Sequence, residues 1–169
     1  VRQLDQKSRY NHGQRKQGRI VSSEVLLKTG LALATAADKA STPLKAAKSL
    51  RDGAMIALLA TMPMRRRAFV ELALGSSFQV ISKGIQVLLS EEMTKNGRPW
   101  EAPVPDILHP ILFRYVNEVR PWFLSRGEQF HDVLWVGNRG APYKNADYFG
   151  RRIREITERQ INIRVSPTF

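Results

Sequence analysis

The segment from Pro43 to about Thr61 constrains the fold most, because its later part is apolar on nearly every side. Thr42 followed by Pro43 is a favourable pairing of an N-cap with a first helical residue, which predicts a helix that begins at Pro43. Pro63 ends or kinks that helix. Residues 54–60 leave no polar face for solvent, so we expect this helix to lie buried at the centre of the molecule.

Capping residues and apolar spacing predict further helices on both sides of this segment. Their expected ranges are residues 24–39, a short helix after the three arginines at 65–67 that Gly75 closes, 107 to about 125, and 145 to about 160. Ser22, Asp106 and Asn145 are the expected N-caps of three of them. Pro121 lies inside the helix from 107 to 125, so a kink or an early end is expected there.

Three short runs rich in β-branched and aromatic residues follow the short helix: Phe78–Ile81, Ile85–Leu89 and Trp100–Val104. Ser82, Lys83 and Gly84 separate the first two runs, a spacing typical of a β-hairpin. Residues 133–136 form one more short apolar run. We therefore expect an α+β fold that is mainly helical, with a small three-stranded antiparallel sheet.

Composition limits the function classes. The chain has 169 residues, of which 43% are hydrophobic, and a formal net charge of +12. With no Cys and three scattered His, disulfide scaffolds, thiol nucleophiles and Cys- or His-based metal sites are excluded or disfavoured. The charge favours nucleic acid as the partner, although a protein that is basic for solubility or for an acidic protein partner has the same composition.

The arrangement of the charge suggests one domain preceded by a basic segment. Residues 1–20 are expected to be a basic arm or interdomain linker, and residues 21–169 the domain. We find no signal peptide and no apolar stretch long enough to cross a bilayer. The expectation is therefore a cytoplasmic protein without a membrane partner.

Three basic features are candidates for chemistry. Arg65, Arg66 and Arg67 stand together at the start of the short helix, Lys95 lies in the turn 94–98, and four arginines lie on the last helix. Each has a plain structural alternative: a solvated helix start, an exposed turn lysine, and ion pairs four residues apart such as Arg151–Glu155 and Arg154–Glu158. Composition does not choose between these readings.

The order of these parts resembles the beginning of a tyrosine recombinase (phage integrase-like) catalytic domain. In that family a buried helix runs into Thr-Gly-Leu-Arg, which resembles RDGAMIALLATMPMR at 51–65. The tip of the family's β-hairpin resembles TKNG at 94–97 of this chain, and the family's next strand resembles WEAPVP at 100–105. The last two matches are LWVGNRGAP at 134–142 and VSP at 165–167.

The resemblance implies a domain that helps to cut and rejoin duplex DNA through a tyrosine nucleophile, with no metal or cofactor. Arg65 corresponds to the arginine that stabilises charge on the phosphodiester, and Lys95 to the general acid for the leaving oxygen. The residues expected to bind DNA are Arg66, Arg67, Arg98, Arg139, Lys144, Arg151 and Arg152. The full-length protein is expected to form a homo-oligomer on DNA.

Departures from the family pattern keep a second interpretation open. Thr168 stands where the family has a His, and the second arginine and nucleophilic Tyr normally follow that point. The expectation is a C-terminally truncated catalytic domain that does not cleave DNA by itself. The alternative is a catalytically inactive DNA-binding remnant or regulator on the same scaffold, and a weaker one is an RNA-binding accessory protein.

Overall fold

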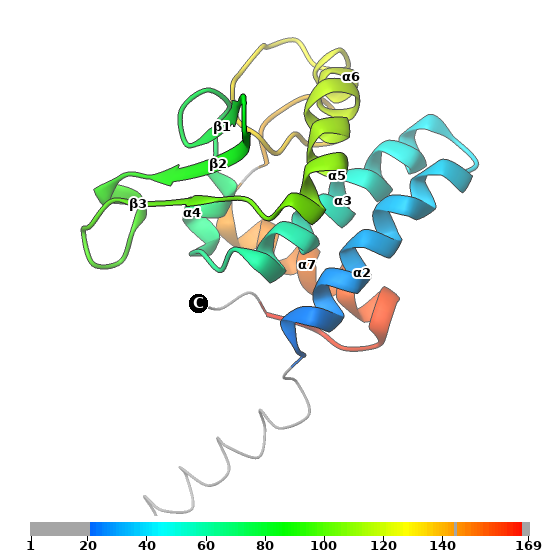
Figure 1. The fold of residues 1–169 in the computed structure, drawn as a ribbon. Coiled ribbons are helices and arrows are strands. Elements are labelled where there is room, and N and C mark those ends of the chain that lie inside the picture. The colour runs from blue at the N-terminus through cyan, green and yellow to red at the C-terminus, as the bar shows by residue number, and fades with distance from the viewer. Residues whose placement is uncertain (1–20, 144, 167–169) are drawn as a thin grey trace, which may run out of the picture.

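The computed structural model describes residues 21–143 and 145–166. The expected basic arm at 1–20, Lys144 and Thr168 lie outside the described residues. The described helices are α2 (Ser23–Ala36), α3 (Pro43–Thr61), α4 (Arg66–Val70), α5 (His109–Arg114), α6 (Arg120–Leu124) and α7 (Ala146–Ile161); the strands are β1 (Phe78–Ile81), β2 (Gly84–Leu89) and β3 (Trp100–Pro103) (Figure 1).

The central position of α3 is confirmed, since all residues from 51 to 59 are buried. Helix α2 lies alongside α3 (Figure 1), and the two backbones meet at glycines. A Cβ placed on Gly53 would lie 2.5 Å from the carbonyl oxygen of Gly30, and one on Gly30 would lie 2.6 Å from the nitrogen of Ala57. This contact between the helices therefore requires residues without a side chain.

The expected N-caps of three helices are confirmed. The Ser22 hydroxyl accepts a hydrogen bond from the Val25 amide, the Thr42 hydroxyl accepts one from the Lys45 amide, and the Asn145 side chain accepts one from the Tyr148 amide. Each bond satisfies an amide in the first turn that has no partner within its helix. The starts of α2, α3 and α7 are thus fixed by local sequence.

The predicted three-stranded antiparallel sheet is also confirmed, with strand order β1-β2-β3. Phe78 of β1 pairs with Val87 of β2, and Val87 pairs with Ala102 of β3. Phe78 and Val87 are fully buried and point into the core. The long connection between β2 and β3 projects from one end of the sheet, beyond the helices (Figure 1).

The short helix was predicted to reach Gly75, and this was wrong, because α4 ends at Val70. The following residues instead pair with a distant segment: the Leu74 amide donates to the Asp132 carbonyl, and the Leu134 amide donates to the Leu72 carbonyl. A ladder of backbone hydrogen bonds to a segment about sixty residues away thus overrides the local preference for helix.

One detail of the helix predicted at 107–125 differs from expectation. Asp106 does not cap it, because Asp106 is itself the first residue of a 3₁₀ turn before α5, and neither the turn nor α5 begins with a side-chain cap bond. The predicted end is confirmed, since the helix continues through Pro121 to Leu124, with a π-helical segment at Tyr115–Val119 between α5 and α6. The wider π turn gives the proline ring, which lacks an N–H, room within the helix.

Candidate nucleic-acid interface

Arg65 lies at the junction between the buried helix and α4. Met62 and Met64 are buried and anchor this junction, while Pro63 and Arg65 are exposed. Arg65 is the N-cap residue of α4 with extended backbone geometry, and its side chain makes no cap hydrogen bond. Its guanidinium forms no ion pair with the described residues. Arg65 is therefore held in place through its backbone, with its charge facing solvent.

Arg66 and Arg67 have acidic neighbours. Arg67 Nε donates to Glu71 Oε1 at 2.8 Å, and this exposed pair raises the pKa of Arg67. Arg66 Nη1 lies 3.8 Å from Asp147 Oδ1, on α7. A Cβ on Gly150 would lie 2.6 Å from the same Nη1, so Arg66 lies directly against α7. The packing of α4 on α7 thus brings these two predicted DNA-binding regions together.

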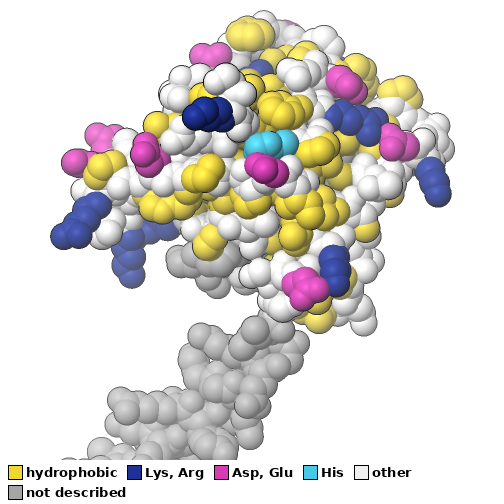
Figure 2. Space-filling view, in the orientation of Figure 1, with side chains coloured by type: hydrophobic (Ala, Val, Ile, Leu, Met, Phe, Trp, Pro, Cys, Tyr) yellow, Lys and Arg dark blue, Asp and Glu magenta, His cyan; other side chains and the backbone are white. Residues whose placement is uncertain are grey.

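Lys95 and Arg98 lie on the connection between β2 and β3. The Thr94 hydroxyl donates to the Arg98 carbonyl at 2.7 Å and closes the tip, and Gly97 there has φ +63°. Both basic side chains are exposed and form no ion pair with the described residues. Figure 2 shows Lys and Arg side chains at this outer end of the sheet. Their charge is available to an anionic partner.

The remaining predicted DNA-binding residues fall into two groups. Arg139 and Arg151 are exposed and unpaired among the described residues. The Arg152 side chain is only 16% exposed, and its Nη2 donates to Asp52 Oδ2 at 2.8 Å. Glu155 is a second acidic partner of Arg152, in place of the expected Arg151–Glu155 pair. Arg152 is thus neutralised within the fold and is not available to a phosphate in this conformation.

Sequence reasoning missed a buried arginine at the centre of the molecule. Arg51, on α3, is 2% exposed, and its guanidinium lies 4.9 Å from the Phe123 ring and 5.3 Å from the Tyr143 ring. Its Nε and Nη2 donate to Asp52 Oδ1, and Nη1 donates to the Val136 carbonyl and to Asn138 Oδ1. Burial lowers the pKa of Arg51, but Asp52 together with Tyr143 and Tyr115 raises it by more, so the pKa is raised overall and the guanidinium stays charged.

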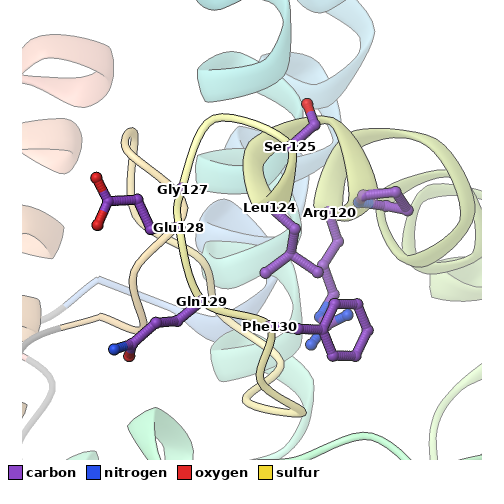
Figure 3. Close-up of a pocket in the computed structure, with 8 residues that line it drawn as sticks. Arg120, Leu124, Ser125, Gly127, Glu128, Gln129 and Phe130 are labelled. Atoms are coloured by element: carbon purple, nitrogen blue, oxygen red, sulfur yellow. The ribbon is translucent and has the colours of Figure 1, made fainter.

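A second buried arginine, Arg120, holds a surface loop. Its Nε and Nη2 donate to the Val133 carbonyl, and Nη2 also donates to the His131 carbonyl. Burial lowers the pKa of Arg120. Arg120 lines a shallow pocket of about 420 Å³ beside the exposed Phe130 (Figure 3).

The described tyrosines do not resemble activated nucleophiles. The Tyr115 hydroxyl is buried, donates to the Leu134 carbonyl and accepts from the Val136 amide, and burial raises its pKa. Burial also raises the pKa of Tyr143 to about 12. A phenol with a raised pKa stays protonated near neutral pH, which is the opposite of activation. Tyr148 is exposed on α7.

The described residues contain no cluster of three or more His, Cys, Asp or Glu suited to a metal ion. No helix among them is long and apolar enough to cross a membrane.

Comparison of the chain with protein-family models, with curated proteins and with solved structures finds no match.

Proposed function

We propose that this chain is the DNA-binding part of a tyrosine recombinase catalytic domain, which cuts and rejoins DNA through a phosphotyrosine intermediate. The observation that carries the proposal is the setting of Arg65 and Lys95. Arg65 lies at the junction between the buried helix and α4, and Lys95 lies at the tip of the β2–β3 connection. Both side chains are exposed and form no ion pair with the described residues. These are the positions in the fold that the resemblance assigns to the two catalytic residues.

The chemistry of these two side chains suits phosphoryl transfer to a tyrosine. Negative charge grows on the non-bridging oxygens of the phosphodiester in the transition state, and a guanidinium stabilises it, bidentately where geometry allows. The leaving 5′-oxygen needs a proton, which the ammonium of Lys95 would donate as general acid. Backbone phosphates would be contacted by the partly buried Arg66 and by the exposed Arg67, Arg98, Arg139 and Arg151. Such contacts give affinity without reading sequence.

The second candidate is a catalytically inactive DNA-binding module on the same scaffold. The burial of Tyr115 and Tyr143 favours it, because their raised pKa values disfavour attack on a phosphodiester. Both candidates bind duplex DNA, and they differ in covalent chemistry.

DNA binding is tested by fluorescence anisotropy of a labelled duplex over a range of salt concentrations. The logarithm of the association constant should fall by about 0.9 per phosphate contacted for each tenfold rise in salt. The Lys95→Ala/Arg98→Ala variant should reduce that slope by the amount that corresponds to up to about two phosphate contacts. A matched control is Lys39→Ala/Lys45→Ala, which removes two exposed lysines at the α2–α3 connection, away from the β2–β3 connection (Figure 1).

Equal loss of slope in both variants would indicate non-specific attraction to the net charge, and a flat salt response of the wild type would refute DNA binding. A nicked suicide duplex separates the two candidates when it is given to a protein that carries this chain together with the catalytic boxes that follow it in the family, because only the first candidate predicts a covalent protein–DNA band there. The 169-residue chain by itself should give no such band under both candidates, and an adduct mapped to any of its four Tyr would refute that expectation.

A further inference from the structure

The turn at residues 137–140 is held by groups outside it. Arg51 Nη1 donates to Asn138 Oδ1 at 2.9 Å, and Arg126 Nε donates to the Asn138 carbonyl at 3.0 Å. Asn138 is thus fixed through both its side chain and its backbone by guanidinium groups from α3 and from the segment after α6. Arg139, the next residue, is exposed.

The backbone of the turn adds to this support. The Gly137 amide donates to the Ala141 carbonyl at 2.7 Å, and the Gly140 amide donates to the Gly137 carbonyl at 3.1 Å. Gly140 has φ +83°, and a Cβ there would lie 2.6 Å from the backbone of Gly127. The turn therefore packs closely on a neighbouring loop, and the Arg51–Asn138 hydrogen bond ties it to the core.

Burial of Arg51 needs a reason, because an apolar side chain in that place usually gives equal or greater stability. An apolar residue cannot donate to Asn138. Asp52 neutralises Arg51 through Oδ1 and binds Arg152 through Oδ2, so one carboxylate supports a network that joins α3, the turn and α7. Directed hydrogen bonding to the turn is what this arginine adds to the fold.

We propose that Arg51 is a positioning residue: through Asn138 it holds the 137–140 turn so that Arg139 binds a backbone phosphate of duplex DNA. This inference rests on the proposed function. No acidic residue lies within the turn, and Arg139 has no partner among the described residues, so its charge is free for an anion. Holding the turn in advance reduces the ordering that binding would otherwise require.

The test measures the salt slope of duplex binding for the wild type, Arg139→Ala, Asn138→Ala and the double variant. Arg139→Ala should lower the slope by about 0.9. When salt falls from 1 M to 0.1 M, the affinity of this variant should therefore rise about eightfold less than that of the wild type. Asn138→Ala removes no charge, yet it should lower the slope by most of that amount. The double variant should lose no more than Arg139→Ala alone, because both changes remove the same phosphate contact.

Asn117→Ala is the matched control, because it removes the same side chain from an exposed position on the π-helical segment. Its slope should equal that of the wild type. A wild-type slope in Asn138→Ala, or losses that add in the double variant, would overturn the positioning role while leaving DNA binding intact. Absence of salt-sensitive binding by the wild type would instead overturn the proposed function and this inference with it.

Discussion

Arg51 and Arg65 lie on the same stretch of chain, fourteen residues apart, but in opposite surroundings. Arg51 is buried, stacks on two aromatic rings and gives its N–H groups to Asp52, Val136 and Asn138. Arg65 is exposed and its guanidinium has no ion pair with the described residues. Arg51 therefore cross-links the interior of the fold, while the charge of Arg65 remains available to a partner.

The difference in surroundings predicts which measured property each arginine affects. Removal of a buried, paired cation takes one partner from its buried carboxylate, so the loss should appear in stability. An exposed, unpaired cation contributes little to folding, so its loss should appear in binding or rate. The same substitution at the two positions should therefore have opposite profiles.

The largest expected effect on stability is that of Arg51→Met. Asp52 would keep only Arg152 as a partner, and breaking a buried ion pair typically costs about 3–5 kcal/mol. Urea unfolding followed by circular dichroism measures the change. Arg65→Met is the matched control and should stay within about 0.5 kcal/mol of the wild type. Equal losses at the two positions would contradict the comparison.

The largest expected effect on rate is that of Arg65→Ala, in a protein that carries this chain together with the catalytic boxes that follow it in the family. Loss of a donor to charge that grows only in the transition state costs about 2.7–4 kcal/mol, or roughly 10²–10³ in rate. DNA affinity should change little, because that charge is absent in the ground state. Single-turnover cleavage measures the rate and anisotropy measures the affinity. Equal losses in both would show that Arg65 binds the DNA backbone rather than stabilising the transition state.

Lys95→Ala in the same protein serves as the contrast to Arg65→Ala. Its cleavage rate should lose a general-acid contribution, and a 5′-phosphorothiolate substrate should restore it, because sulfur departs without a proton. The same substrate should leave Arg65→Ala inactive. Failure to restore Lys95→Ala would remove Lys95 from the acid role.

A smaller loss of stability is expected from Gly53→Ala, on the same buried helix as Arg51. The added methyl group would press on the Gly30 carbonyl at 2.5 Å, and overpacking of this kind costs about 1–3 kcal/mol. Gly75→Ala is the comparison at the surface, where φ is +80° and no atom lies within 4 Å. Backbone strain alone should cost it about 1 kcal/mol. Thermal unfolding measures both losses. A larger loss of stability in Gly75→Ala than in Gly53→Ala would contradict close contact of α2 with α3.

Local signals explain which parts of the fold the sequence could predict. Thr42 and Pro43 fix the start of α3 by a side-chain bond and a restricted φ, both of which involve only neighbouring residues. The apolar, β-branched run at residues 85–89 and the hairpin spacing before it are likewise enough to assign β2. Leu72 to Leu74 were assigned wrongly, because their partner at Val133 lies far along the chain.

The same distinction applies to the candidate site. The exposure of Lys95 follows from its place in a turn, so the sequence could predict it. The burial of Arg51 and Arg152 depends on contacts with residues 85 to 100 positions away, and no local pattern reports them. An Arg-Asp pair at positions 51–52, at the start of an apolar stretch, was the one available hint of a buried ion pair.

The smallest expected effect concerns Arg67, which is exposed like Arg65 but paired. Glu71 accepts a hydrogen bond from Arg67 at 2.8 Å and competes with a phosphate for its charge. Glu71→Gln should therefore strengthen duplex binding about twofold at low salt, since exposed pairs of this kind are weak. Glu118→Gln is the matched control, because Glu118 pairs four residues away with Arg114, which lies outside the proposed contact set. Both variants reduce the negative charge by one, so an equal gain in anisotropy titrations would trace the effect to net charge. A gain confined to Glu71→Gln would place Arg67 at the DNA.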